Sequence, residues 1–307
     1  MRTVVFAYHN LGIVGLEALK EKGFDIGAIF SHQDAPEENI WFDSVVEWAK
    51  KNRIPVFCPE NVNTPEWIEK IRKMLPEVIF SFYYRRMLSN EILNMPTSGA
   101  FNFHGSLLPS YRGRCPVNWV LVNGEPRTGV TLHYMVEKPD AGDIVGQREV
   151  PIQFEDTALT LYEKLCTEAK ALLAEVLPLI RNGNAPRRVQ PLEGTSYFGG
   201  RKPEDGKIDW HWPVMRIYNL IRAVTEPYPG AFTFLPKGEK LFVWWAYPER
   251  GSGLHSEIGT IEVEEKSVYV RASDGRLRLI DIEDGRERLK SHGIFEYFKN
   301  KKGIVLK

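Results

Sequence analysis

The chain has few cysteines, no long apolar run and no excess of charge of either sign. Its three cysteines, Cys58, Cys115 and Cys166, lie far apart in the sequence, which is typical of neither a disulfide framework nor a zinc site. No apolar run approaches the ~20 residues that a membrane-spanning helix needs. Residues 1–7 resemble a short strand and lack the features of a secretory signal. We therefore expect a cytoplasmic protein with no membrane partner.

The charge balance and the placement of the histidines argue against two further classes of protein, those that bind nucleic acid and those that bind a metal. Lysine and arginine together number 40, equal to the 40 aspartates and glutamates, whereas nucleic-acid-binding proteins usually carry a basic excess. The seven histidines are scattered, and the sequence has no His-x-x-x-His or Cys-x-x-Cys pair. A nucleic-acid partner is therefore not favoured, and no metal site is expected.

The first half of the chain alternates strand-like and helix-like segments. Apolar runs of strand length occupy residues 3–7, 26–30, 78–82, 100–103, 128–135 and 144–150. Helical spacing of apolar residues, or helix-start signals, mark residues 12–22, 42–52, 64–66 and 158–182. This alternation predicts an α/β domain over residues 1–183, with a doubly wound, mostly parallel, Rossmann-like sheet.

The second half has a different character. Residues 184–206 are rich in proline, glycine, arginine and glutamate with little periodicity, so we expect a linker there. One helical segment, residues 213–225, is followed by short strand-like runs separated by glycine and charged residues. Residues 207–307 are therefore predicted to form a smaller β-barrel domain of OB-like type.

The sharpest chemical signal is the segment 101–113, which reads Phe-Asn-Phe-His-Gly-Ser-Leu-Leu-Pro-Ser-Tyr-Arg-Gly. Alternate residues of a strand share a face, so Asn102 and His104 point the same way at the carboxyl end of a predicted parallel strand. An amide N–H can stabilise the oxyanion of an acyl transfer, and an imidazole can take a proton from an attacking amine. The plainer alternative is a buried histidine bonded to the backbone beside a turn asparagine.

A histidine in that role needs a group that sets its orientation and charge. Asp140 lies in the turn Lys138-Pro139-Asp140-Ala141-Gly142-Asp143, where proline and glycine favour a tight loop. Asp143 lies in the same turn, and spacing alone does not choose between the two aspartates.

These motifs resemble the signature of the 10-formyltetrahydrofolate-dependent transferases. The resemblance rests on residues 102–109, on Arg112-Gly113, and on Asp140-Ala141-Gly142. It implies that Asn102, His104 and Asp140 are the catalytic residues, with Asp140 chosen over Asp143. It also implies transfer of a formyl group from 10-formyltetrahydrofolate as co-substrate.

The resemblance extends over nearly the whole chain. Residues 6–9, 80–85, 118–125 and 128–133 are similar to the formyltransferase half of the bifunctional polymyxin-resistance protein, which formylates UDP-4-amino-4-deoxy-L-arabinose in lipid A modification. It therefore implies a nucleotide-linked aminosugar as acceptor, with UDP-4-amino-4-deoxy-L-arabinose first. A homo-oligomer is compatible with the sequence.

The same resemblance implies contacts for both substrates. Folate contacts fall on Arg86, Met87, Leu88, Arg114, Val136, Glu137, Lys138, Pro139 and Asp140. Met87 and Leu88 would form an apolar floor for the pterin, although without the resemblance they would be assigned to the core. Arg86 stands where the polymyxin-resistance relative is expected to have histidine, so the backbone there should matter more than the side chain.

For the acceptor, Arg201 offers a cation for a diphosphate, and Tyr228 offers a ring for a nucleobase. The plainer alternative places Arg201 in a solvated linker.

Two other functions remain open at this stage. A methionyl-tRNA formyltransferase would share the catalytic core, but such relatives carry a basic insertion after the second strand, where residues 34–39 are short and acidic. A non-catalytic folate- or nucleotide-binding protein would share the fold, and the intact triplet argues against it. The turn at residues 9–15 resembles a dinucleotide-binding loop only weakly, because Asn10 replaces its first glycine.

Overall fold

The computed structural model describes residues 1–33, 39–251 and 256–307, which fold into two compact units. The first unit comprises residues 1–116, 127–151 and 162–199, and the second comprises residues 117–126, 152–161 and 200–307. Each unit thus gathers segments that are separated in the sequence, and the contiguous boundaries predicted above stay a prediction. Most of the acidic segment that argues against a tRNA acceptor, residues 34–38, lies outside the described residues.

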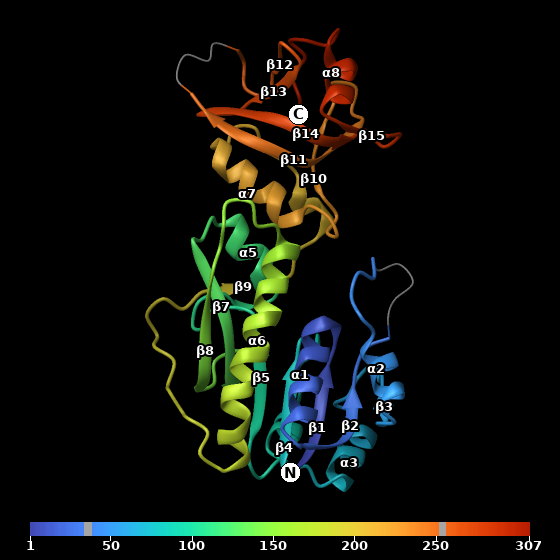
Figure 1. Cartoon of the computed structure of the whole chain (residues 1–307), viewed down its shortest axis with the longest axis vertical. Coiled ribbons are helices and arrows are strands. Elements are labelled where there is room, and N and C mark those ends of the chain that lie inside the picture. The colour runs from blue at the N-terminus through green and yellow to red at the C-terminus, as the bar shows by residue number, and fades with distance from the viewer. Residues whose placement is uncertain (34–38, 252–255) are drawn as a thin grey trace. The chain divides into compact units, whose positions relative to one another are not determined.

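A seven-stranded sheet forms the centre of the first unit, in the order β3-β2-β1-β4-β5-β7-β8 (Figure 1). Its strands are β1 (Arg2–Ala7), β2 (Asp25–Phe30), β3 (Val56–Phe57), β4 (Val78–Phe82), β5 (Ala100–His104), β7 (Arg127–Tyr134) and β8 (Ile144–Pro151). Neighbours from β3 to β5 run parallel, whereas β7 is antiparallel to both β5 and β8. The predicted α/β class with a mostly parallel sheet is confirmed.

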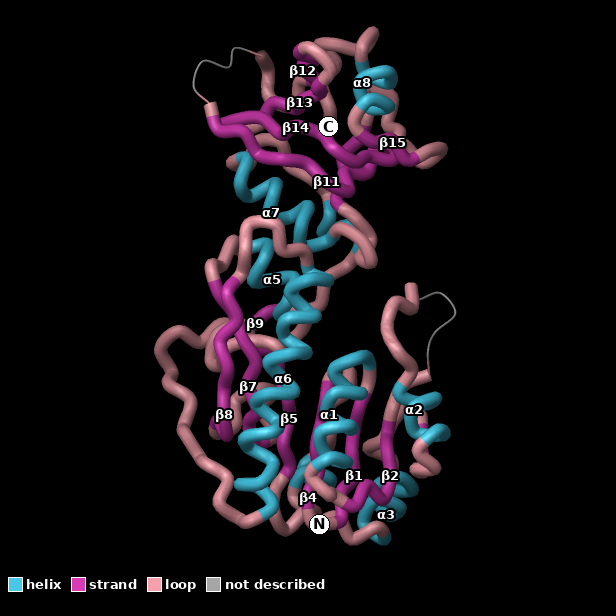
Figure 2. The backbone as a smooth tube through the Cα atoms, viewed as in Figure 1, coloured by secondary structure: helices cyan, strands magenta, loops and turns pink. Residues whose placement is uncertain are grey.

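Helices cover both faces of this sheet. They are α1 (His9–Glu21), α2 (Val45–Lys51), α3 (Pro65–Lys73), α4 (Asn90–Leu93) and most of α6 (Ala158–Arg181). Figure 2 labels α1, α2, α3 and α6 among the cyan helices. On one face, Ile71 of α3 and Ile92 of α4 join Phe6 and Ile79 in a buried cluster. On the other face α1 lies very close to β4, because a Cβ on Gly15 would lie 2.4 Å from the Phe82 ring.

The second unit is built on an antiparallel sheet in the order β10-β11-β14-β13-β12, with β15 paired to β14. Its elements are α5 (Pro116–Val122), η1 (Pro203–Gly206), α7 (Val214–Val224), β10 (Ala231–Phe234), β11 (Lys240–Arg250), β12 (Ile261–Glu264), β13 (Ser267–Arg271), β14 (Gly275–Glu283), β15 (Arg288–Lys290) and α8 (His292–Phe298). The sheet is consistent with the predicted OB-like domain.

Residues 305–307 join the two ends of that sheet. Val305 bridges Thr260, which precedes β12, and Lys307 exchanges two backbone hydrogen bonds of 3.0 and 2.9 Å with Phe234 of β10. The last residues therefore pair with the edge strand β10 and with the residue that precedes the edge strand β12.

None of the helices in the described part of the chain is both long enough and apolar enough to cross a bilayer.

Candidate active site

β5 carries two polar side chains on one face and two phenyl rings on the other. Phe101 and Phe103 are 0% and 2% exposed, and Phe101 stacks on Phe80 with ring centroids 5.5 Å apart. The alternation of a strand therefore directs Asn102 and His104 to the opposite face, as the sequence predicts. Strong burial of the rings fixes the register of this short strand, because a slip of one residue would move both rings to the opposite face of the sheet.

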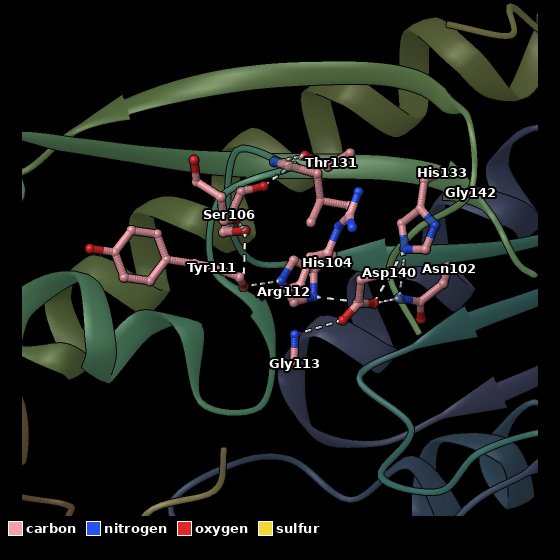
Figure 3. Close-up of polar contacts among 12 residues, drawn as sticks. Asn102, His104, Ser106, Tyr111, Arg112, Gly113, Thr131, His133, Asp140 and Gly142 are labelled. Atoms are coloured by element: carbon pink, nitrogen blue, oxygen red, sulfur yellow. Dashed lines mark hydrogen bonds and ion pairs between the residues drawn. The ribbon is translucent and has the colours of Figure 1, made fainter. Parts of the chain in front are cut away.

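The backbone carbonyl of Tyr111 fixes the tautomer of His104. His104 Nε2 lies 2.7 Å from that oxygen, and since a carbonyl only accepts, the neutral ring carries its proton on Nε2. The basic lone pair is therefore on Nδ1, which lies 3.6 Å from Oδ1 of Asp140. A proton taken up by His104 would come to rest beside that carboxylate (Figure 3).

Asp140 contacts both Asn102 and His104 in this cluster. Its Oδ2 accepts a 2.8 Å hydrogen bond from the backbone N–H of Gly113, and its Oδ1 faces Asn102 Nδ2 at 3.4 Å. Burial raises the pKa of Asp140, but the adjacent imidazoles of His104 and His133 and the hydrogen bond from the Gly113 N–H together outweigh it, so the pKa lies well below its ordinary value. The carboxyl group is therefore ionised at neutral pH.

The structure separates the two candidate aspartates. The carboxylate of Asp143 lies 3.7 Å from Arg187, and its backbone carbonyl accepts from the N–H of Tyr134. Asp140 alone of the two is paired with His104. The geometry thus agrees with the choice that the family resemblance implies.

Sequence reasoning missed His133. This residue of β7 pairs in register with Asn102 of β5, and its Nε2 lies 3.1 Å from Asn102 Nδ2 and 3.5 Å from Asp140 Oδ1. The available signal was a histidine within a strand-like run, but the antiparallel pairing that brings it to Asn102 is not readable from the run itself.

A short ribbon that the sequence did not predict holds the loop after β5. β6 (Arg112–Gly113) pairs with β9 (Tyr197–Phe198), and the Tyr111 ring stacks on Phe198 with centroids 4.8 Å apart. β9 lies within the segment that we expected to be a linker.

Gln190, from the same segment, connects the cluster to that loop. Its Oε1 accepts from buried Arg112, and its Nε2 donates to the carbonyl oxygens of Asp140 and Gly142. A residue fifty positions away in the chain therefore fixes the turn that carries the Asp140 carboxylate.

The residues predicted to contact folate follow β4 and β7. Met87 is 52% exposed and Val136 43% exposed, whereas Leu88 is 5% exposed and belongs to the core cluster of the first unit. Arg86 donates to the carbonyl of Pro59, so its side chain is tied to the protein.

The remaining predicted folate residues are distributed over two loops. Arg114 follows β6 and donates its backbone N–H to Phe198. Residues 137–139 are half-buried or exposed and lead into Asp140.

The predicted acceptor contacts belong to the second unit. The Arg201 guanidinium lies 4.6 Å from the centroid of the Trp119 ring and donates to the carbonyl of Asp205. Tyr228 is half-buried in the turn after α7, where its N–H bonds to Thr225. Both side chains thus make contacts within the second unit.

The family models match both halves of the chain. A model described as formyl transferase matches residues 1–177, and one described as the C-terminal domain of formyl transferase matches residues 201–299. The chain belongs to the formyl transferase family. This formyl transferase is accordingly an enzyme, and the cluster around His104 lies within the matched N-terminal region.

Solved structures share the fold of this formyl transferase. An N-formyltransferase from Helicobacter canadensis, in complex with folinic acid and dTDP-3-aminofucose, superposes with a TM-score of 0.67 at 22% identity, covering 91% of this chain and 98% of that one. WlaRD, a sugar 3N-formyl transferase solved with dTDP and 5-N-formyl-THF, gives 0.67 at 19% identity, covering 91% and 97%.

A third structure carries the same fold in a longer protein. HypX from Aquifex aeolicus, in complex with tetrahydrofolic acid, gives a TM-score of 0.62 at 19% identity, and the match covers 97% of this chain but 48% of HypX. At these identities the likeness establishes the fold alone, so the acceptor must be argued from the site.

Proposed function

We propose that this formyl transferase moves a formyl group from 10-formyltetrahydrofolate onto the amine of a nucleotide-linked aminosugar, with UDP-4-amino-4-deoxy-L-arabinose as the first candidate. The observation that carries the proposal is the cluster of Asn102, His104 and Asp140. It brings together an amide donor, a base nitrogen of fixed tautomer and an ionised carboxylate. Asp140 Oδ1 lies 3.4 Å from Asn102 Nδ2 and 3.6 Å from His104 Nδ1.

Each group has a distinct part in the reaction. As the sugar amine forms its bond to the formyl carbon, Asn102 Nδ2–H stabilises the oxyanion. Nδ1 of His104 takes the proton that the amine loses, and Asp140 stabilises the resulting imidazolium. When the bond from the formyl carbon to the folate nitrogen breaks, His104 returns the proton to that nitrogen. Atoms and charge balance, and no metal is required.

The residues after β4 and β7 fit a folate. Bound formyl-folate supplies an activated one-carbon unit, and its ring system needs apolar surface close to polar groups. Met87 and Val136 are large apolar side chains that remain exposed on loops, and Val136 lies four residues before Asp140. Leu88 supports this surface from the core, so of this residue only the backbone would contact the folate.

A nucleotide sugar is supported by the second unit and by the relatives. Arg201 is held over Trp119, which leaves a cation in a fixed position for a diphosphate. Two structures with the same fold were solved with dTDP-3-aminofucose or dTDP. The resemblance at residues 80–85 and 118–125 favours the arabinose acceptor over dTDP sugars.

Turnover distinguishes this proposal from a protein that only binds folate. The purified chain, supplied with 10-formyltetrahydrofolate and UDP-4-amino-4-deoxy-L-arabinose, should release tetrahydrofolate and yield a sugar that gains one formyl group by mass spectrometry. Folate binding without release of tetrahydrofolate, across UDP- and dTDP-linked aminosugars, would leave the non-catalytic function as the better account.

A further inference from the structure

The tautomer of His133 is fixed by its own strand. Its Nδ1 lies 2.8 Å from the backbone carbonyl of Tyr134, which only accepts, so Nδ1 carries a proton. In the neutral ring Nε2 then has a free lone pair directed at Asn102 and Asp140. The side chain is 2% exposed, so water does not compete for this lone pair.

His133 and Asp140 form one acceptor pair for Asn102. The atoms Asn102 Nδ2, His133 Nε2 and Asp140 Oδ1 make a nearly equilateral triangle with sides of 3.1, 3.4 and 3.5 Å. The two acceptors thus subtend about 60° at Nδ2, whereas the two N–H bonds of a planar primary amide diverge by about 120°. The two N–H bonds therefore cannot both point straight at the acceptors. The shorter contact, to His133, holds one N–H, and the second N–H has only the longer 3.4 Å contact to Asp140.

The reverse orientation of the amide is disfavoured. It would bring the Asn102 oxygen against an ionised carboxylate oxygen and against the lone pair of His133, with no hydrogen between them. Repulsion at these distances in a buried site costs more than the loss of a single neutral hydrogen bond. The pair therefore keeps the nitrogen of Asn102 turned inward, with its second N–H held only by the long contact to Asp140.

We propose that His133 is a positioning residue, which holds the amide of Asn102 so that its second N–H stays available to the oxyanion. This inference rests on the proposed function, because an oxyanion donor is needed only if acyl transfer takes place. His133 touches neither substrate in this account and acts through Asn102. Asp140 provides the other half of the pair while also serving His104.

Two replacements separate positioning from packing. His133→Gln keeps an acceptor oxygen on the side chain, whereas His133→Leu keeps apolar volume and removes the acceptor. We expect His133→Leu to lower kcat about tenfold or more with KM for 10-formyltetrahydrofolate within about twofold, and His133→Gln to retain most of the kcat. If His133 only filled space, the leucine variant would be the more active of the two, which would overturn the inference.

Coupling to Asn102 gives a second test. In an Asn102→Ala background, His133→Leu should cause no further loss of kcat, because the group it positions is absent. An equal loss in both backgrounds would overturn the inference. The exposed histidine variant His211→Leu is the matched control and should leave kcat unchanged, since His211 is 77% exposed on the second unit.

A spectroscopic test works without turnover. In the ¹⁵N spectrum of the free protein, His133 should show a protonated Nδ1 and an unprotonated Nε2, and the side-chain amide signal of Asn102 should shift in His133→Leu but little in His133→Gln. An unshifted amide would overturn the inference even if the enzyme is active. An inactive wild-type protein with the expected spectrum would instead count against the proposed function.

Discussion

The backbone N–H of Gly113 donates a 2.8 Å hydrogen bond to Oδ2 of Asp140, and this bond leaves Oδ1 to Asn102 and the two histidines. Gly113 has φ +97°, a region that side-chain-bearing residues rarely adopt, and a Cβ there would lie 2.2 Å from the carbonyl oxygen of Phe198. The orientation of the Asp140 carboxylate therefore depends on a glycine in the β6–β9 ribbon.

Replacing this glycine should damage both stability and catalysis. Gly113→Ala must push β6 and β9 apart and shift the N–H of residue 113 that binds Asp140, so we expect a loss of more than about 2 kcal/mol in the free energy of unfolding and a lowered kcat. Gly183→Ala is the control, because Gly183 also has a positive φ but nothing lies within 4 Å of its Cβ position. It should cost about 1 kcal/mol and leave kcat unchanged. If Gly113→Ala and Gly183→Ala changed urea unfolding and turnover to the same extent, the role given to Gly113 would be contradicted.

Removing the base or the amide should affect the chemical step. His104→Ala and Asn102→Ala should each lower kcat by about a hundredfold or more, the usual scale for loss of a general base or an oxyanion donor. Folate affinity should change little, because its expected contacts lie mainly on other residues. Rapid-quench kinetics and fluorescence titration with 10-formyltetrahydrofolate measure the two quantities separately. Wild-type turnover in His104→Ala would refute the assignment.

Asp140→Asn should change the pH dependence of stability. Because the pKa of Asp140 is depressed in the folded protein, its carboxylate stabilises the fold above the ordinary aspartate pKa, and that contribution is lost as pH falls through the folded value. The stability gap between wild type and Asp140→Asn should therefore be constant near neutrality and shrink below about pH 4. Urea unfolding at several pH values measures it, and a gap that persists at acid pH would be inconsistent with an ionised Asp140.

His9 should give a second acid-sensitive contribution. Burial and the nearby charge of Arg85 lower its pKa to about 3, and its Nδ1 lies 2.6 Å from the hydroxyl of Tyr162. Between about pH 6.5 and 3, His9 is protonated in the unfolded chain but neutral in the folded protein. The free energy of unfolding should therefore fall as the pH drops through this range, by up to about 1.4 kcal/mol per pH unit.

The variant His9→Asn isolates this effect. Asparagine tolerates the φ of +66° at this position and does not titrate. The slope of stability against pH should flatten in this variant but not in the exposed control His211→Asn. An unchanged slope would mean that His9 is protonated in the fold.

Much of the fold could be predicted from the sequence because it depends on local patterns of apolar residues. The strands at 78–82 and 100–103 and the helix at 158–182 are long apolar patterns, and each appears in the structure within about two residues. The start of α1 was placed at residue 12 rather than His9, because the entry into the helix uses a left-handed backbone at a histidine. The antiparallel direction of β7 depends on pairing across the sheet, which no single run records.

The candidate site could be predicted from the sequence only in part, because several of its contacts depend on tertiary packing rather than on local sequence. Asn102 and His104 are two residues apart on one strand, so period-two alternation places them together. The partners His133, Gly113 and Gln190 reach the cluster through an antiparallel register, a two-residue ribbon and a segment without periodicity. Such contacts are set by tertiary packing, and composition in the segment 184–206 indicated only a linker.

The central claim is the transfer of formyl to a nucleotide-linked aminosugar, and a competition assay tests it most directly. With 10-formyltetrahydrofolate held constant, UDP-4-amino-4-deoxy-L-arabinose, dTDP-linked aminosugars and methionyl-tRNA are offered together, and formylated products are measured by mass spectrometry against a His104→Ala control. We predict that the UDP-linked sugar is formylated first and that the control forms almost no product. Preference for a dTDP-linked sugar would correct the acceptor, whereas preferential formylation of methionyl-tRNA, or no formylated product at all, would contradict the account.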